Sequence, residues 1–179
     1  MSDQPVRTRI LTPDGWLGFQ EFFVREKAQP EVLDVTYEGA DRAAPAPGVT
    51  EAISEARAVI VCPSNPITSI GPILAMPGIV QALKETAATV CAISPIVGGA
   101  PVSGPAGKLM AAKGLPVSAV GVAAVYREWL DRLVIDGQDQ ALGPELLRLG
   151  VSPIGADTLM TDRLKEVGLV RAVLEAIGW

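Results

Sequence analysis

The segment that says most about the fold is Pro63-Ser64-Asn65-Pro66-Ile67-Thr68-Ser69-Ile70-Gly71-Pro72. It follows Arg57–Cys62, a short apolar run rich in β-branched residues that predicts a buried strand. Because proline bars regular pairing, this strand must end and turn outward at its carboxyl end. Pro72 then suits the first position of a helix. Strand, polar turn and helix start, in this order, mark the place where open α/β sheets bind anionic ligands, which predicts a phosphorylated ligand.

From residue 45 onward the sequence alternates between strand and helix patterns. Four strands separated by helices indicate a mostly parallel sheet with right-handed crossovers, in a Rossmann-like layered α/β fold. The predicted strands are 57–62, 89–94, 132–136 and 151–155, and the predicted helices lie near 47–56, 72–86, 103–113, 118–130, 138–149 and 161–177.

The first 44 residues have a different pattern. Val6–Leu11 and Leu17–Val24 alternate and flank Pro13-Asp14-Gly15, a good hairpin signal, and Asp34–Glu38 predicts a third strand. We therefore expect a β-hairpin or sheet-edge segment over 1–44, attached to an α/β segment over 45–179 as one structural unit. Because the α/β part opens without a Gly-rich phosphate loop and would leave an unpaired sheet edge, we expect it to be the second half of a larger domain.

Composition limits the classes of function. Hydrophobic residues make up 49% of the 179 residues and aromatic residues only 4%, which favours helices layered on a parallel sheet. The net charge of -5 and the lack of Lys/Arg runs argue against a nucleic-acid partner. No apolar run reaches the ~18 residues of a membrane span, and no signal peptide is visible, so we expect a cytoplasmic protein without a membrane partner.

The chain contains no histidine. This excludes a Ser-His-Asp triad, a Cys-His nucleophile pair and any His-ligated metal site within the chain. Cys62 and Cys91 fall at the ends of predicted strands, and we expect two reduced core thiols rather than a disulfide.

A second polar loop, Ser94–Pro105, follows the predicted strand 89–94 and should emerge on the same sheet edge as the first. Gly98 and Gly99 permit positive φ and close approach of backbone N–H groups to a ligand. Ser103 is a candidate cap for a helix starting at Pro105, and Lys108 could reach a phosphate. The alternative is a surface turn followed by an ordinary capped helix, but two such loops at one edge favour binding.

The last candidate loop is Asp157–Asp162, after strand 151–155. Asp162 is expected to cap the final helix, whereas Asp157 could face the cleft. Asp136 and Asp139 could bind a metal, although solvated turn carboxylates are commoner. Along helix 118–130, Tyr126, Trp129 and Leu130 recur at helical spacing, which is typical of a core stripe; a stacking wall for a flat ring is the alternative.

Several of these motifs together resemble the 2-phospho-L-lactate transferase family, whose members act in the biosynthesis of the deazaflavin coenzyme F420. The likeness runs from about residue 1 to about residue 165. Individually the motifs are modest, but in series they are specific. They are Phe19–Arg25, Pro63–Pro66, Ser69–Ala75, Pro77–Ile79, Ser94–Gly99, Gly104–Ala106, Gly121–Ala123 and Asp157–Asp162.

The resemblance implies a transfer reaction on small-molecule substrates. Family members pass the phosphoester group of GDP-activated lactate or enolpyruvate to the ribityl hydroxyl of the deazaflavin Fo and release GMP. Magnesium assists, and positioning with electrostatics carries most of such a reaction, which suits a chain without histidine. Which of the two activated acids is used, and which residues are catalytic, stays open.

The chain also departs from the family pattern. The opening strand with its Gly-rich nucleotide loop and the acidic motifs for metal and acceptor are not present, so the magnesium ligands are expected to be missing. In addition, Gly107 and Val125 stand where an acidic residue and a histidine are common. We therefore expect the carboxyl-terminal part of a transferase, inactive alone, whose partner is a missing amino-terminal half or a second copy in a homodimer. The predicted substrate-binding residues are Ser64, Asn65, Thr68, Ser69, Gly71, Ser94, Gly98, Gly99, Lys108 and Asp157, with no metal ligand among them.

Two other hypotheses stay open. The chain could be a non-catalytic regulatory module of the related fold that binds a nucleotide-linked ligand. It could also be a truncated product without a role of its own. Binding of deazaflavin, binding of a nucleotide sugar alone, or an exposed apolar sheet edge would separate these cases.

Overall fold

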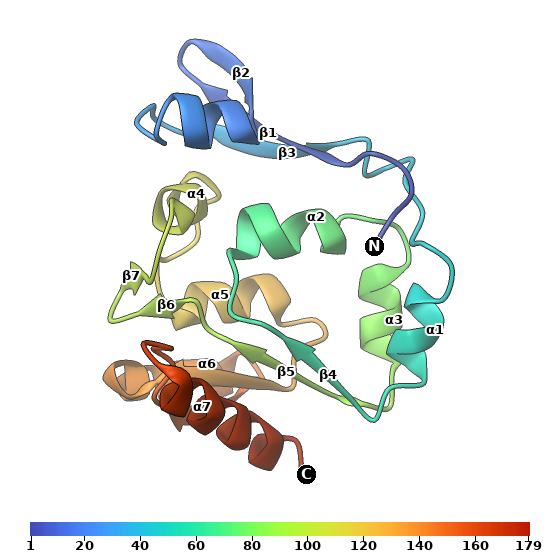
Figure 1. The fold of residues 1–179 in the computed structure, drawn as a ribbon, viewed down its shortest axis with the longest axis vertical. Coiled ribbons are helices and arrows are strands. Elements are labelled where there is room, and N and C mark those ends of the chain that lie inside the picture. The colour runs from blue at the N-terminus through green and yellow to red at the C-terminus, as the bar shows by residue number, and fades with distance from the viewer.

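The computed structural model describes residues 1–179 and has a four-stranded parallel sheet at its centre (Figure 1). The strands are β4 (Ala58–Val61), β5 (Thr89–Ile93), β8 (Arg132–Asp136) and β9 (Ser152–Ala156), and they lie in the order β4-β5-β8-β9. All three pairings are parallel, for example Ile60 opposite Cys91 and Val134 opposite Ile154. The predicted parallel α/β sheet is therefore confirmed, and the order of its four strands in space is their order along the chain.

Helices cover the two faces of the sheet unequally. On one face α7 (Arg163–Ala176) buries a small cluster of Cys91, Ile93, Val134, Leu169 and Val173. The main core lies on the other face, where Met110 and Tyr126 are fully enclosed. The helices that contribute to this side are α1 (Val49–Ser54), α2 (Gly71–Leu74), α3 (Ile79–Glu85), α4 (Ala106–Ala112), α5 (Ala119–Tyr126) and α6 (Gly143–Arg148).

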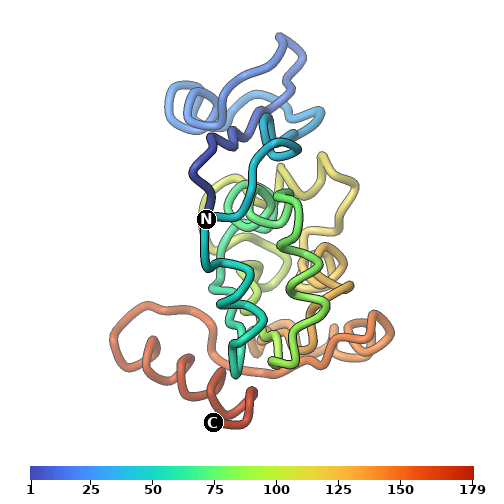
Figure 2. Tube along the Cα trace, turned by 90° about the vertical axis from the view of Figure 1, so that its right-hand side faces the viewer, coloured from blue at the N-terminus to red at the C-terminus, as the bar shows by residue number.

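The amino-terminal residues form a separate antiparallel sheet of β1 (Arg7–Thr12), β2 (Gly15–Gly18) and β3 (Asp34–Glu38), in the order β2-β1-β3. The predicted hairpin is confirmed, with Thr12 opposite Gly15. This sheet lies at one end of the molecule and α7 at the other (Figures 1 and 2). Ile10 and Val35 of this sheet, and Phe22 of the segment between β2 and β3, belong to the main core, so the amino-terminal and α/β segments share one hydrophobic interior. A small hairpin of β6 (Ile96–Val97) and β7 (Ala100–Pro101) projects after β5.

Three element predictions need correction. The second strand of the hairpin was predicted to reach Val24, but it ends at Gly18, and Glu21–Arg25 forms a π-helical turn, η1. The Glu21 carboxylate accepts a hydrogen bond from the Gly18 N–H at 3.3 Å, and this contact favours the helical turn over a continued strand. The predicted helix 72–86 is three segments: it starts earlier, with the π-helical turn η2 (Pro66–Ile70), and it breaks at Pro77-Gly78, where Gly78 has a φ of +90°. The predicted helix 138–149 is likewise a 3-10 segment, η3 (Gly137–Leu142), followed by α6.

The helix predicted over 118–130 ends at Tyr126, but its three bulky residues do pack in the core. Tyr126, Trp129 and Leu130 are all at least nine-tenths buried, and the rings of Tyr126 and Trp129 lie 4.8 Å apart. Ser118 caps the helix by accepting a hydrogen bond from the Gly121 N–H. The prediction of a core stripe is therefore confirmed.

The strand predicted to be buried, β4, is an edge strand. Its residue Ile60 is 43% exposed, because no further strand pairs with β4 and α7 does not cover it. The prediction of two core thiols is confirmed for Cys91, which is fully buried, and wrong for Cys62, which is exposed just after β4; both are free thiols.

No single helix has the length and apolar character to cross a membrane. Pro66–Leu74 and Ile79–Glu85, bent by 84°, meet that standard only as a pair and only by length and composition. Within this pair Ile67, Ile79 and Leu83 are buried in the core.

Candidate functional site

The carboxyl ends of the parallel strands carry the polar loops that the sequence singled out, and two pockets lie among these loops. We call the first the Asn65 pocket. It has a volume of about 350 Å³ and is lined by Phe19, Pro63, Ser64, Asn65, Thr68, Ser69, Pro95, Val102, Ser103, Gly104, Pro105, Ala106 and Met160. The loops after β4 and β5 therefore meet at one rim, as predicted, and residues from the amino-terminal segment and from the loop after β9 complete the wall.

Asn65 holds the first loop in shape. Its Oδ1 accepts hydrogen bonds from the N–H groups of Ile67 at 2.9 Å and Thr68 at 3.2 Å, so it caps the helical turn that follows. This is the usual task of an asparagine before a helix with proline at its first position. The amide NH₂ of Asn65 donates to no protein group. Asn65 thus has a structural role through its oxygen and keeps two donors for a ligand.

The hydroxyl groups of the Asn65 pocket are also without protein partners. Ser64, Thr68 and Ser69 line the pocket, and their side chains make no hydrogen bond within the protein. Each hydroxyl can donate one hydrogen bond and accept two. A cluster of uncommitted hydroxyl and amide groups at a strand-end rim suits a ligand with phosphate or polyol oxygens.

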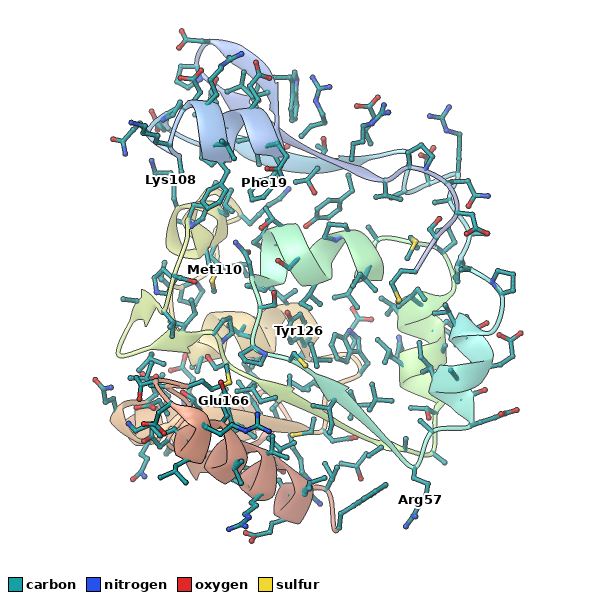
Figure 3. The ribbon with its side chains drawn as sticks, in the orientation of Figure 1. Phe19, Arg57, Lys108, Met110, Tyr126 and Glu166 are labelled. Atoms are coloured by element: carbon teal, nitrogen blue, oxygen red, sulfur yellow. The ribbon has the colours of Figure 1, made fainter.

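Two large apolar side chains, Phe19 and Met160, also line the Asn65 pocket. The ring of Phe19 stacks on Phe23 with centroids 5.6 Å apart and planes 4° from parallel. Phe19 lies on the side of the amino-terminal sheet that faces α2 and α4 (Figure 3). Sequence reasoning missed Phe19 and Met160 as site residues. Both stand inside motifs that carry the family likeness, which was the available signal.

Gly71, a predicted binding residue, has a packing role. A Cβ atom there would lie 2.0 Å from Tyr37 Oη and 3.1 Å from the Pro66 carbonyl oxygen, so only glycine fits. The Tyr37 hydroxyl donates a hydrogen bond to the Ile67 carbonyl, and burial raises the pKa of Tyr37 to about 12. This contact fixes the helical turn behind the Asn65 pocket to β3, and Gly71 does not line the pocket.

The second loop divides into a part that reaches the Asn65 pocket and a part that does not. Ser103, Gly104 and Pro105 line the pocket, but Ser103 does not cap α4, whose first flanking residue is Pro105 without any side-chain cap. Ser94 is buried, and its hydroxyl bonds to the N–H and the carbonyl of Ile96, which shapes the turn.

Gly98 and Gly99 lie at the tip of the β6–β7 hairpin, outside the Asn65 pocket. Both have the predicted positive φ, +58° and +79°. The Gly98 N–H donates to Asp139 Oδ2 at 3.1 Å, so this donor is already occupied within the protein. The glycine pair therefore ties the hairpin to the segment after β8.

Lys108 also has a partner other than the predicted phosphate. Its ammonium donates to the carbonyl oxygens of Ala28, Gln29 and Pro30 at 2.7, 3.0 and 3.1 Å. Lys108 lies between α4 and the amino-terminal segment (Figure 3). It thus binds the loop between η1 and β3 and holds that loop against α4, together with the ion pair of Lys113 and Asp34 at 2.7 Å.

The second pocket, which we call the Asp136 pocket, lies at the ends of β8 and β9. It has a volume of about 450 Å³ and is lined by Asp136, Gly137, Gln138, Gln140, Gly155, Ala156, Asp157 and Leu159. Asp157 lines this pocket, in agreement with the prediction that it could face a cleft. Its carboxylate, however, forms an ion pair with Lys165 at 2.9 Å. Asp162 caps α7 by accepting from the N–H groups of Leu164 and Lys165, as predicted.

Asp136 and Asp139 are buried, not solvated turn carboxylates. Asp136 accepts from the N–H and side chain of Gln138 and from the N–H and hydroxyl of Thr158, at 3.0 to 3.2 Å. Burial alone would raise the pKa of Asp136, but these hydrogen bonds outweigh it and lower the pKa. Both carboxylates therefore serve to join the loops after β5, β8 and β9. The chain offers no group of three or more Cys, Asp or Glu side chains that could hold a metal ion.

Comparison with known proteins gives the chain clear relatives. The family model for 2-phospho-L-lactate transferase CofD matches residues 1–174. The chain is 46% identical over 176 residues to the 2-phospho-L-lactate transferase of Methanosarcina mazei, covering 98% of this chain and 57% of that protein. It is 43% identical to the enzyme of the same name from Methanothermobacter thermautotrophicus, covering 99% of this chain and 52% of that protein. The chain thus spans a little more than half the length of these relatives.

Among solved structures, a UPF0052 family protein from Bacillus halodurans is similar, with a TM-score of 0.66. The match covers 94% of this chain and 59% of that chain at 17% sequence identity. At this identity the likeness concerns the fold alone.

Proposed function

Since the chain belongs to the 2-phospho-L-lactate transferase CofD family, we propose that it forms the substrate-binding part of a transferase of coenzyme F420 biosynthesis. The observation that carries this proposal is the Asn65 pocket, where loops after two parallel strands bring uncommitted hydroxyl and amide groups to one rim. Its substrates would be the deazaflavin Fo and GDP-activated lactate or enolpyruvate. We place the reaction in the cytoplasm.

The polar and apolar groups that line the Asn65 pocket suit the two parts of such a substrate. Ser64, Asn65 and Ser69 offer hydrogen bonds to ribityl or phosphate oxygens, whereas Phe19 and Met160 offer apolar contacts to a flat ring. In the transfer, the ribityl hydroxyl oxygen forms a new P–O bond, the bond to the GMP leaving group breaks, and the hydroxyl proton is released. The contribution of this chain is to hold the hydroxyl in place, which is a large part of catalysis in phosphoryl transfer.

Magnesium, which the family resemblance implies, does not fit the residues of this chain, because no group of acidic side chains gathers at the Asn65 pocket. We therefore derive no step through the metal. Both oxygens of the buried carboxylate of Asp136 accept hydrogen bonds from Gln138 and Thr158, and Asp139 Oδ2 accepts one from the Gly98 N–H. We propose that the chain alone does not turn over substrate.

Titration with Fo, followed by deazaflavin fluorescence, tests the proposal. We expect saturable binding that weakens about tenfold in the double variant Ser64→Ala/Ser69→Ala, as expected for two lost hydrogen bonds with a net worth of ~0.7 kcal/mol each. Ser152→Ala, the same change on an exposed strand residue, is the matched control and should bind normally. Binding that the double variant does not alter would contradict the assignment of this pocket. Binding of a nucleotide sugar, without binding of Fo, would identify a regulatory module instead.

Turnover is measured separately, by mass spectrometry of GMP and of the deazaflavin product after incubation with both substrates. We expect none from the chain alone. Turnover by the chain alone would show that its own residues complete the active site.

A further inference from the structure

The only two non-glycine residues of the chain with positive φ follow one another just after η1. They are Lys27, with a φ of +51°, and Ala28, with a φ of +53°. This left-handed region is unfavourable for residues with a Cβ atom, which visit it singly rather than in succession. Such a backbone persists only where neighbouring contacts hold it, and it is common where a structure positions a ligand or another residue. We call residues 26–30 the left-handed turn.

One side chain from a distant part of the sequence, Lys108, holds the left-handed turn. Its ammonium donates hydrogen bonds to the carbonyl oxygens of Ala28 at 2.7 Å, Gln29 at 3.0 Å and Pro30 at 3.1 Å. An ammonium group has three donors, so these three carbonyl groups use all of them. The contact is therefore complete without a ligand, and Lys108 has no donor left for a phosphate.

The left-handed turn is joined to η1 through the backbone. The Ala28 N–H donates to the Phe22 carbonyl at 2.9 Å, and the Gln29 N–H donates to the Glu26 carbonyl at 2.9 Å. Phe22 itself is fully buried in the main core. A movement of the left-handed turn would therefore be passed directly to the backbone of η1.

The residues before η1 bring Phe19 to the Asn65 pocket. Phe19 lies one turn ahead of Phe23 in η1, and their rings stack. α4 supplies another residue of the pocket lining, Ala106, and carries Lys108 two residues later. Lys108 and Phe19 both lie on the side of the amino-terminal segment that faces α4 (Figure 3). The contact of Lys108 with the left-handed turn thus joins two parts of the chain that line the same pocket.

We propose that Lys108 is a positioning residue: by holding the left-handed turn against α4, it keeps Phe19 in the lining of the Asn65 pocket. It acts through Phe19 and does not touch the ligand. Its consequence for the binding of Fo rests on the proposed function, whereas its effect on the left-handed turn does not. The experiments therefore measure the two effects separately.

Hydrogen exchange of the 179-residue chain, followed by mass spectrometry, tests the contact without any ligand. Lys108→Met keeps a side chain of similar length and removes its donors. We expect the N–H groups of residues 19–30 to exchange at least about fivefold faster in this variant, and those of β5 and β8 to exchange as in the wild type. Unchanged exchange over residues 19–30 would overturn the proposal.

Lys113→Met is the matched control for the loss of one positive charge at α4. The Lys113 ammonium pairs with Asp34 on β3 and makes no contact with the left-handed turn. Exchange of residues 19–30 should stay within about twofold of the wild type in this variant, because a half-exposed ion pair contributes little. Equal acceleration by both substitutions would make charge, and not the contact of Lys108, the cause.

Fo binding, followed by deazaflavin fluorescence, tests whether Lys108 acts through Phe19. We expect Lys108→Met to weaken binding about fivefold and Phe19→Ala about tenfold. In the Phe19→Ala background, Lys108→Met should weaken binding by less than about twofold, because the ring that it positions is gone. A fivefold effect in both backgrounds would indicate that Lys108 contacts the ligand directly, and the proposal would be wrong.

Ala28→Gly provides a rescue that separates positioning from a general loss of stability. Glycine adopts a φ near +53° without the penalty of a Cβ atom, so the left-handed turn should keep its shape without Lys108. We expect Lys108→Met/Ala28→Gly to exchange more slowly over residues 19–30 than Lys108→Met and to recover most of the affinity for Fo. Absence of rescue in exchange would contradict the proposal. If the wild-type chain did not bind Fo, the proposed function would fail, and the exchange rates of these variants would still decide whether Lys108 holds the turn.

Discussion

In the Asn65 pocket the hydroxyls of Ser64, Thr68 and Ser69 make no hydrogen bond within the protein, whereas in the Asp136 pocket both carboxylate oxygens of Asp136 are taken. Both pockets lie at carboxyl ends of strands of the same sheet, and polar side chains line both. They differ in the partners of their polar side chains, which are protein groups in the Asp136 pocket and are lacking for the hydroxyls of the Asn65 pocket. A polar side chain at a strand end can hold loops together or hold a ligand, and its existing partners decide which role it takes.

Substitutions in the two pockets should therefore affect different properties, stability in one and ligand binding in the other. In the Asp136 pocket, removal of a side chain leaves buried groups without partners and costs stability. In the Asn65 pocket, removal of a hydroxyl leaves no protein group unsatisfied and should change ligand binding instead.

The largest effect is expected for Asp136→Ala. It leaves the N–H and the hydroxyl of the buried residue Thr158 without their acceptor, and it also removes the acceptor of the N–H of Gln138, which is an exposed residue. We expect a loss of roughly 3 kcal/mol in the free energy of unfolding, measured by urea denaturation. A loss below ~1 kcal/mol would show that water replaces these contacts, and the contrast between the two pockets would fail.

The pH dependence of stability in Asp136→Asn tests whether the negative charge of Asp136 contributes to this effect. The folded-state pKa of Asp136 lies below its unfolded value of about 3.9, so the charged side chain stabilises the fold above that pH. This contribution is lost as pH falls through the folded pKa. The difference in unfolding free energy between the wild-type protein and Asp136→Asn should therefore be largest at neutral pH and shrink on acidification. A difference that stays constant down to about pH 3 would mean that the charge is not involved.

Gly71→Ala is next, with an expected loss of about 2 kcal/mol, because the new methyl group would overlap the Tyr37 hydroxyl behind the Asn65 pocket. Gly137 lines the Asp136 pocket, and no atom lies within 4 Å of the place that a methyl group would take there. Gly137→Ala is therefore the control and should change stability by less than about 0.5 kcal/mol. In a Tyr37→Ala background the cost of Gly71→Ala should fall, as a thermal double-mutant cycle would measure. Equal costs in both backgrounds would exclude the clash as the cause.

Sequence reasoning found the parallel strands and the rim because these depend on local patterns. Thr89–Ile93 and Arg132–Asp136 are short apolar runs, and polar turns follow them directly. It was wrong about the burial of β4, since an apolar strand has the same pattern whether or not its neighbour is present. It also placed helix ends poorly where Pro77-Gly78 interrupts an apolar stretch.

Of the candidate site, the residues next to β4 could be predicted and those farther from the strands could not. Ser64, Asn65, Thr68 and Ser69 reach the pocket because the turn after a strand has little freedom. The partners of Lys108 stand 78 to 80 residues earlier in the chain, and Gly98 meets a carboxylate 41 residues later. Contacts of this kind depend on tertiary packing, which no local pattern contains.

A smaller effect is expected for Asn65, which has both roles at once. Asn65→Ala removes the cap of the helical turn and should cost about 1 kcal/mol in unfolding free energy as well as weaken binding. Asn65→Asp keeps the acceptor oxygen, so stability should stay within about 0.5 kcal/mol of the wild type. Because the new carboxylate repels phosphate, Asn65→Asp should still weaken the binding of the phosphorylated donor, measured by calorimetric titration. Normal donor binding by this variant would remove Asn65 from the site and leave it only the capping role.

The smallest stability change, and the sharpest test of the comparison, is expected for Ser69→Ala. Its hydroxyl has no protein partner, so unfolding free energy should change by less than about 0.5 kcal/mol. Ligand affinity should nevertheless fall several-fold, because one of the hydroxyl groups that line the pocket is lost. Thr158→Val is the matched change in the other region: it removes the hydroxyl that donates to Asp136, and it should lower stability and leave Fo binding unaltered. If both variants instead changed stability alike and binding alike, the hydroxyls of the two pockets would be equivalent, and the free hydroxyls would not mark the ligand site.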